Sequence, residues 1–293
     1  MEITFPPDAI RVLDKGFVRL VDCMGDDSSI VQAARVSYQT GTKTLEADEG
    51  LIRYLMRHRH TTPFEMVEFK FHCRMPIFVA RQWIRHRTAS VNEMSGRYSE
   101  MPEMFYEPSP ELCTTQSAQN KQGGSGTQIE NSADVALTFG EMQAEIYQHY
   151  KGYLAMGMRR ELARVNLPLA MYTEWYWKID LHNLLHFLDL RLGSHAQYEI
   201  REFALAMAEI VSERVPITWR AFNDYRLCSM SFSGIELRLL GALLNGEELS
   251  DELLEDAIPN KRERAEFIKK IEEIRCCEEC DSSRVSNACA NAI

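Results

Sequence analysis

The sequence predicts a globular fold that mixes a few β-strands with a larger number of α-helices. Three observations lead to this prediction. Residues 67–74 alternate apolar and polar side chains, as a half-buried strand does. Elsewhere, apolar residues recur mostly at helical spacing. The composition, with 45% hydrophobic and 26% charged residues in 293, is that of an ordinary globular protein long enough to bury a substantial core.

The first third of the chain predicts strands and helices in alternation. Residues 10–24 predict one or two short strands with a turn between Asp14 and Gly16. N-cap residues at 26–29 precede a helical pattern that includes Ile30 and Tyr38. The next elements expected, in order, are a helix over 45–58, a strand over 67–74, and a helix from Pro76 to about Ile84.

After residue 84 the pattern becomes more polar before helices return. Residues 87–110 predict mostly loop, and residues 113–133, rich in Gly, Ser, Thr, Asn and Gln, predict a mobile surface insertion. Helices are expected over 133–156, 158–165, 181–191 and 195–215, with a strand over the aromatic run 171–179. Towards the C-terminus, the sequence predicts helices over 235–244, 249–257 and 259–275, the last with a solvated charge run at 261–270, and then a frayed end.

The overall charge limits the classes of ligand that the protein is expected to bind. A net charge of −10 repels nucleic acid and acidic membranes, so a polyanion must meet a local cluster of Arg or Lys. A small phosphorylated ligand fits this constraint better than duplex DNA does. No stretch approaches the roughly 20 apolar residues that span a bilayer, and the start lacks a secretory layout. We therefore expect a cytoplasmic protein whose eight cysteines are thiols.

One segment gathers basic and hydroxyl side chains. In order it holds Arg85, His86, Arg87, Thr88, Ala89, Ser90, Val91, Asn92, Glu93, Met94, Ser95, Gly96, Arg97 and Tyr98. A helix of this sequence would have no apolar stripe, so burial in a core does not explain it. Guanidinium and hydroxyl groups suit phosphate recognition, and Gly96 would let the backbone approach a ligand closely. By composition alone, a solvated loop held by ion pairs remains equally open.

The order of these residues resembles the signature of the flavin-dependent thymidylate synthases. That signature reads Arg-His-Arg, two residues, Ser, one residue, Asn-Glu, one residue, Ser, one residue, Arg-Tyr, and residues 85–98 match every specified position. The resemblance extends over about residues 10–225. It is also carried by His60 to Glu65, by Arg81-Gln82-Trp83, by 162–164 with 167–169, by 188–191, and by 194–197.

The resemblance implies a fold and an assembly. The fold would be α+β, with a central, mainly antiparallel sheet flanked by helices, in a homotetramer whose active sites are shared between subunits. Residues 1–225 would form the catalytic domain, including the insertion at 113–133, and residues 226–293 a helical extension with a frayed tail. The tail cysteines are expected to be free thiols, with a zinc or redox site as the alternative: Cys276, Cys277, Cys280 and Cys289.

The resemblance also implies dUMP as the substrate. The residues expected to contact it are Gln82, Arg85, Glu93, Met94, Ser95, Gly96, Arg97, Arg164 and Arg191. The phosphate suits Arg97 and the amides near Ser95, whereas the uracil needs directional hydrogen bonds. Arg191 would be the catalytic residue, because a guanidinium beside uracil N3 favours the uracil anion and raises electron density at C5. Without the resemblance, Arg191 would be read as a cation at a helix C-terminus.

FAD is the cofactor that the resemblance implies. Its expected contacts are Thr62, Arg85, His86, Arg87, Glu93, Asp180, His182 and His186. Some family members place Asn, Arg and Asn at the last three positions, so we expect altered detail there rather than lost binding. NADPH would reduce FAD, and methylenetetrahydrofolate would supply the one-carbon unit, giving dTMP, tetrahydrofolate and NADP. No glycine-rich dinucleotide fingerprint appears in the sequence.

Histidine, cysteine and serine side chains also allow other chemistry. His182 and His186 share a helix face, yet Asn183 stands where a zinc motif needs Glu, so no metal is expected and a packing face is the alternative. Neither Cys23 nor Cys73 has the surroundings of an activated thiolate. Ser95 lacks a local base, and we expect it to orient the ligand.

Two rival functions remain on the sequence alone. One is a flavoprotein of the same fold that acts on another nucleotide without folate. The other is a non-catalytic binder of nucleotides or nucleic acid that uses the same arginines. The first would form no dTMP, and the second would purify without a flavin spectrum.

Overall fold

The computed structural model describes residues 3–36, 45–117, 123–193 and 195–275. The chain divides into two compact units, Met1–Phe222 and Asn223–Ile293. The expected boundary after residue 225 falls inside a π-helical turn, Asn223–Leu227. Among the described helices, none is long and apolar enough to cross a membrane.

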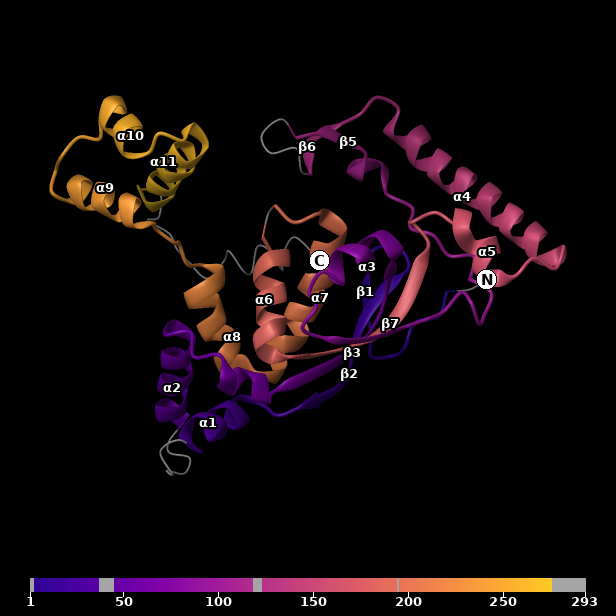
Figure 1. Ribbon diagram of the computed structural model, residues 1–293, viewed down its shortest axis with the longest axis horizontal. Helices are drawn as coiled ribbons and strands as arrows, with labels where there is room; N and C mark the ends of the chain where they lie inside the picture. The colour runs from indigo at the N-terminus through magenta and orange to yellow at the C-terminus, as the bar shows by residue number, and fades with distance from the viewer. Residues whose placement is uncertain (1–2, 37–44, 118–122, 194, 276–293) are drawn as a thin grey trace. The chain divides into compact units, whose positions relative to one another are not determined.

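A five-stranded sheet forms the centre of the first unit (Figure 1). Its strands are β1 (Ile10–Val12), β2 (Gly16–Met24), β3 (Glu68–Pro76), β7 (Tyr172–Asp180) and β4 (Ser90–Glu93), in the order β1-β2-β3-β7-β4. Every neighbouring pair is antiparallel, which confirms the expected antiparallel sheet. The strands at 10–24 and 67–74 lie where the alternating pattern placed them, within two residues.

One face of this sheet carries the core. Along β3, Phe69, Phe71 and Cys73 are fully buried, and along β7 Trp175 and Trp177 face the same side. Three helices cover that face: α3 (Ile77–Trp83), α6 (Leu181–Arg191) and α7 (Tyr198–Arg214) (Figure 1).

The indole of Trp83 joins these helices to the sheet. Its ring centroid lies 5.3 Å from those of both Trp175 and Trp177, and 5.1 Å from that of Phe187 on α6. Aromatic contacts of this kind add to the free energy of area burial, so α3 and α6 are held at a fixed spacing. Gln82 near the end of α3 and Arg191 at the end of α6 are residues that the sequence assigns to the site.

A smaller helical group packs at the end of the sheet. It consists of α1 (Asp27–Arg35), α2 (Leu45–Arg57) and α8 (Pro216–Phe222), of which α8 was not predicted. Asp26 caps α1 through a capping box, as expected, whereas Tyr38 lies outside the described residues. The carboxylate of Asp27 accepts hydrogen bonds from the amides of Ile217 and Thr218 and from the Thr218 hydroxyl, at 2.6–2.9 Å.

Two regions contain strands that the sequence does not reveal. Residues 87–110 are mostly loop, as the sequence predicts, but β4 pairs with β7 there; all four residues of β4 are exposed, so no burial pattern reveals the strand. Residues 113–133 are predicted to form a mobile surface insertion, and within them β5 (Thr114–Gln116) and β6 (Gly124–Gln128) form a two-stranded sheet. Both strands consist of polar residues and glycine, so they lack the apolar alternation by which strands are recognised.

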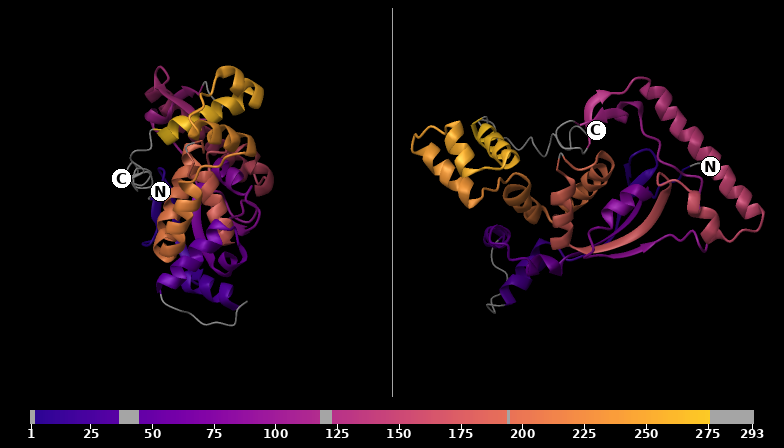
Figure 2. Two further views of the ribbon diagram at one scale, coloured as in Figure 1. Left: turned by 90° about the vertical axis from the view of Figure 1, so that its left-hand side faces the viewer. Right: turned by 45° about the horizontal axis from the view of Figure 1, so that its top comes forward.

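Beyond this hairpin runs α4 (Ser132–Ala155), the longest described helix, followed by α5 (Arg160–Ala163) and a 3-10 turn, Arg164–Asn166. Figure 2 shows α5 folded back beside α4. The expected helices at 133–156 and 158–165 are thus confirmed, the second as a shorter helix with a 3-10 end.

The second unit is a group of three helices, α9 (Gly234–Leu244), α10 (Asp251–Ala257) and α11 (Lys261–Arg275). The charge run at 261–270 was expected to be solvated, but Phe267 is fully buried within it. Lys270 also reaches Glu236, which is only 4% exposed, at 2.7 Å. The tail cysteines 276, 277, 280 and 289 lie outside the described residues.

Removing the Asp27 carboxylate should weaken the first unit. Asp27→Ala leaves the first amides of α8 without their acceptor, so we expect the free energy of unfolding to fall by about 2 kcal/mol. Urea denaturation followed by tryptophan fluorescence measures this, because all four tryptophans belong to the first unit. Asp22→Ala is the matched control, because the exposed Asp22 side chain makes no hydrogen bond or ion pair with a described residue. An equal loss in both variants would contradict this account.

Candidate active site

The signature segment runs from the end of α3, through β4, into a turn at residues 95–99. The fully buried Trp83 ends α3, and the amide of His86 donates to its carbonyl at 3.0 Å. The Thr88 hydroxyl then donates to the Asn183 side-chain oxygen at 2.8 Å. Asn183 in turn donates its amide group to Asp180 at 2.7 Å. The signature is thereby tied to the start of α6.

Five of the predicted site residues gather where α3 and α6 end, and we call them the α3–α6 cluster: Gln82, Arg85, His86, His186 and Arg191. The imidazoles of His86 and His186 have centroids 5.8 Å apart. His86 also lies edge-on to Phe187 at 5.0 Å. Arg191 lies close enough to His86 to lower the pKa of that imidazole, and Arg85 lies close enough to Arg191 to lower the pKa of its guanidinium.

Basic side chains lie close together in the α3–α6 cluster and lower one another's pKa. Burial, then Arg191 and His186, lower the pKa of His86 to about 4, so its imidazole is neutral at pH 7. Burial and the nearby Arg85 lower the pKa of Arg191. Among the described residues, neither Arg85, Arg87 nor Arg191 makes an ion pair with a carboxylate. Such an arrangement is stabilised by an anionic or acceptor-rich ligand.

Two buried polar atoms of the cluster have no hydrogen-bond partner. They are Gln82 Oε1, an acceptor, and Arg191 Nε, a donor. Leaving such atoms unpaired costs free energy of about 1–3 kcal/mol each, so a native structure that keeps them usually has a use for them. Both residues line one cavity of about 820 Å³. Asp189 lines it too, but no ion pair joins Asp189 to Arg191 within the described chain.

The hairpin β5–β6 forms another wall of this cavity, which the sequence did not reveal. The lining residues from the hairpin are Thr114, Thr115, Gln116, Gly123 and Gly124. Gly124 is packed so closely that a Cβ atom there would lie 2.0 Å from Thr114 Oγ1. The polar composition, without apolar alternation, gives no signal for this hairpin in the sequence.

A second group of site residues is built around the turn at 95–99. The Ser95 carbonyl accepts from the amides of Tyr98 and Ser99 at 3.2 and 3.3 Å, which closes the turn. A Cβ atom at Gly96 would lie 2.6 Å from Met101 Sδ and 3.1 Å from Arg164 Cδ. The structure therefore brings Arg164 against Gly96, although 68 positions separate them in the sequence.

Arg97 extends from this turn into solvent. Its Nε lies 3.3 Å from a carboxylate oxygen of Glu161, and both side chains are exposed. Arg164 makes no ion pair with a described residue. An exposed pair of this kind contributes little to stability, so Arg97 can exchange Glu161 for a phosphate.

Glu93 ends β4, and Met94 follows it, so both lie in the chain between the two groups. The Thr173 hydroxyl donates to Glu93 Oε1 at 2.6 Å, and the Met94 amide donates to the Glu174 carbonyl at 2.9 Å. Within the described residues, however, no hydrogen bond or ion pair joins the α3–α6 cluster to the turn at 95–99. One chain thus brings together Gln82, Arg85 and Arg191, and separately Ser95 to Arg97 with Arg164.

The remaining expected cofactor residues lie around α6. Thr62 begins a 3-10 helix, Thr62–Met66, that packs against α6. Asp180 caps α6 and accepts from the Asn183 amide at 2.9 Å as well as from its side chain. His182 is half-buried and His186 exposed. Asn183 therefore bridges the cap and the signature, and among the described residues no three potential metal ligands cluster.

The cysteines of the sheet do not have the surroundings of nucleophiles. Cys73 is fully buried, and burial raises the pKa of its thiol well above the ordinary value. Burial also raises the pKa of Cys23. An activated thiolate needs the opposite shift, so both residues agree with the prediction that they are not activated.

Comparisons with known proteins identify the family. Residues 19–217 match the family of thymidylate synthase complementing proteins. The flavin-dependent thymidylate synthase of Thermus thermophilus is 59% identical over 241 residues, covering 82% of this chain and 88% of that protein. The enzyme of the same name from Rickettsia conorii is 51% identical over 282 residues, covering 92% and 94%.

Solved structures agree with the sequence relatives. The UMP/dUMP methylase PolB from Streptomyces cacaoi, bound with 5-Br dUMP, is 33% identical with a TM-score of 0.67, and the match covers 74% of this chain and 98% of that one. The matched family region contains the whole signature, Gln82, Arg164 and Arg191. This chain therefore belongs to the flavin-dependent thymidylate synthase family.

Proposed function

We propose that this protein converts dUMP to dTMP, with methylenetetrahydrofolate as the one-carbon donor and NADPH-reduced FAD as the source of hydride. Its family supports the reaction, and so does PolB, a UMP/dUMP methylase. The observation that carries the proposal is the pair of unpartnered atoms, Gln82 Oε1 and Arg191 Nε, on one cavity.

A uracil ring is complementary to these two atoms. Its N3–H is a donor flanked by two carbonyl acceptors, and the cavity offers an acceptor on Gln82 and a donor on Arg191. The phosphate would bind Arg97, Arg164 and the amides around Ser95. The full set proposed to contact dUMP is Gln82, Arg85, Glu93, Met94, Ser95, Gly96, Arg97, Arg164 and Arg191.

Arg191 is the proposed catalytic residue. As electron density moves from the ring nitrogen towards C5, negative charge develops on the uracil beside the guanidinium. A partly buried guanidinium stabilises that charge more strongly than a solvated one would, and it stays charged at neutral pH. Arg85, whose charge adds to this field, strengthens the effect. C5 can then attack the one-carbon unit.

The residues around α6 fit a flavin dinucleotide. Arg85 and Arg87 have no carboxylate partner among the described residues, which suits a diphosphate, and His86 and His186 offer ring nitrogens side by side. The proposed FAD contacts are Thr62, Arg85, His86, Arg87, Glu93, Asp180, His182 and His186. When bound, reduced FAD supplies the hydride that completes the methyl group.

The two groups of site residues also support a shared site. In one chain, the α3–α6 cluster and the turn at 95–99 make no polar contact with each other within the described residues. A homotetramer in which another subunit brings the second group to the first would complete the pocket. We propose this assembly, with residues 1–225 as the catalytic domain, acting in the cytoplasm.

Turnover separates this proposal from its rivals. The purified protein is incubated with dUMP, methylenetetrahydrofolate and NADPH, and dTMP is measured by mass spectrometry. We expect dTMP from a yellow protein with a flavin spectrum. A flavin spectrum without dTMP would favour a flavoprotein acting on another nucleotide, and a colourless protein would favour a non-catalytic binder.

Arg191→Ala should abolish catalysis while leaving the flavin in place. Loss of the guanidinium removes a charge that acts mainly on the transition state, so we expect dTMP formation to fall about 100- to 1000-fold. Turnover assays and the flavin content of the purified variant measure this. Arg238→Ala, at an exposed position of α9 in the second unit, is the matched control. Normal turnover in Arg191→Ala would refute the proposed role.

The His86 imidazole should remain neutral in mildly acidic solution. Its pKa of about 4 lies below the ordinary 6.5, so the folded protein binds this proton less readily than the unfolded chain. Stability that depends on neutral His86 should thus be complete above pH 6.5 and be lost as the pH falls towards 4. Titration of the ring protons by NMR measures the pKa, which Arg191→Ala should raise. A wild-type pKa near 6.5 would contradict this assignment.

A further inference from the structure

We propose that Tyr147 and Tyr150 of α4 are positioning residues for the phosphate of dUMP. They hold the turn at 95–99 through the backbone of Met101, and neither is expected to touch the substrate. This inference rests on the proposed function, in which Ser95, Gly96 and Arg97 receive the phosphate.

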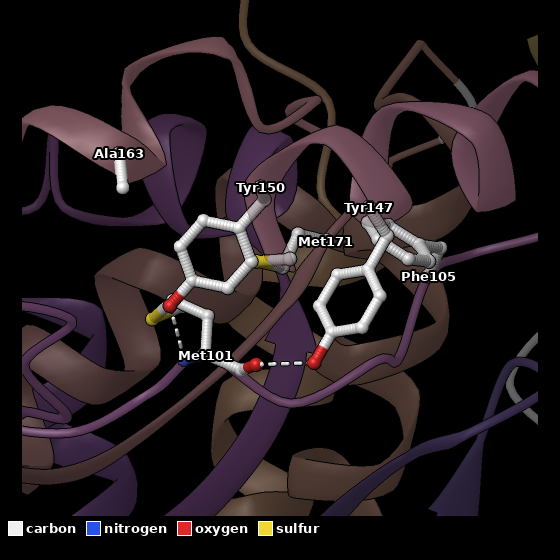
Figure 3. Packing of buried hydrophobic residues seen from close by; sticks show 6 residues of the cluster. All are labelled: Met101, Phe105, Tyr147, Tyr150, Ala163 and Met171. Atoms are coloured by element: carbon white, nitrogen blue, oxygen red, sulfur yellow. Dashed lines mark hydrogen bonds between the residues drawn. The ribbon is translucent and has the colours of Figure 1, made fainter. Parts of the chain in front are cut away.

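The two tyrosines bind both peptide groups of a single residue (Figure 3). The Tyr147 hydroxyl donates to the Met101 carbonyl at 2.9 Å, and the Met101 amide donates to the Tyr150 hydroxyl oxygen at 3.0 Å. Met101 and Tyr147 are each 6% exposed, and Tyr150 is 1% exposed. Water therefore does not replace either bond readily, and the chain at Met101 is fixed at two points.

The helix makes this clamp rigid. Tyr147 and Tyr150 are three positions apart, so they project from the same face of α4. Their ring centroids lie 5.6 Å apart, and Tyr147 also packs edge-on against Phe105 at 6.0 Å. Next to the clamp, Lys151 of α4 pairs with Glu100. Three successive contacts thus attach residues 100 and 101 to one long helix.

Met101 transmits this position to the turn. Because a Cβ atom at Gly96 would lie 2.6 Å from Met101 Sδ and 3.0 Å from its Cγ, the thioether lies directly against the Gly96 backbone. The adjoining Ser95 carbonyl closes the turn by accepting from Tyr98 and Ser99. A shift of Met101 would therefore move the amides proposed to bind the phosphate.

The same cluster supports Arg164. Ala163, only 3% exposed, packs in one cluster with Met101, Tyr147 and Tyr150 (Figure 3). The next residue, Arg164, places its Cδ 3.1 Å from the position of a Gly96 Cβ. The tyrosine clamp thus sets the separation between the Arg164 guanidinium and the turn, which are the two sides of the proposed phosphate site.

Tyr153 is a matched control that separates the proposed positioning role of Tyr147 and Tyr150 from general packing of α4. Tyr153 follows Tyr150 by three positions on α4 and packs against the same cluster. Its hydroxyl makes no hydrogen bond with a described residue. Tyr153→Phe therefore repeats the chemical change of Tyr147→Phe and Tyr150→Phe without removing a bond to Met101.

The test uses the flavin-loaded enzyme and its variants Tyr147→Phe, Tyr150→Phe, the double variant and Tyr153→Phe. The Kd for dUMP is read from the change in flavin absorbance, and kcat and KM come from dTMP formation. We expect Kd and KM for dUMP to rise about tenfold in each of the first two, with kcat within about twofold. In the double variant, the Kd for dUMP should rise by less than the product of the two single-variant increases, because both tyrosines act through one residue. Tyr153→Phe should match wild type.

Several results would overturn the proposal. If the Kd for dUMP is unchanged in both single variants, whatever their melting temperature, the tyrosines only pack in the core and do not position the phosphate site. An equal loss of dUMP affinity in Tyr153→Phe would also show that the effect is one of core packing. If a tyrosine variant fails to fold, Met101→Ala tests the same coupling, because it keeps the backbone groups that the tyrosines bind and removes the thioether that lies against Gly96. It should raise the dUMP Kd at unchanged flavin content; no rise refutes the coupling. A wild-type enzyme that binds no dUMP refutes the proposed function itself, before any variant is compared.

Discussion

Positive charge without a carboxylate partner is the constraint on which this site depends. The exposed Arg85 lies close to Arg191, and the partial burial of Arg191 strengthens their repulsion by lowering the local dielectric. The fold tolerates this repulsion because the packing of Trp83 against Trp175 and Phe187 fixes the spacing of α3 and α6. The free energy stored in this arrangement is available to a ligand that brings acceptors and negative charge. A nucleotide satisfies both needs.

The rest of the fold holds two groups of residues, one suited to the base of a nucleotide and one suited to its phosphate. Strand β7 links them, since it begins beside the cluster around Met101 and ends at the cap of α6. The α3–α6 cluster offers directional donors and acceptors suited to a base, whereas the turn at 95–99 offers backbone amides and guanidinium groups suited to a phosphate. Rigid elements hold each group, which is how proteins keep binding residues within small tolerances.

The sequence predicted the parts of this structure whose pattern is local. The alternation in residues 67–74 identified β3, and the helical repeat identified α6 to the residue. It missed β4 and the hairpin β5–β6, because strands of exposed polar residues lack alternation, and α8, whose start depends on the distant Asp27. The signature located the site residues by order. Only the fold shows that Gly96 meets Arg164, or that Gln82 and Arg191 carry unpaired atoms on one cavity.

A crystal structure of the flavin-loaded enzyme with dUMP tests the central claim most directly. The account predicts that the uracil edge lies within hydrogen-bond distance, about 2.7–3.2 Å, of both Gln82 Oε1 and Arg191 Nε. It also predicts that the phosphate lies against Ser95, Arg97 and Arg164, with the two groups contributed by different subunits. A carboxylate of another subunit paired with Arg191, with dUMP bound elsewhere, would contradict it.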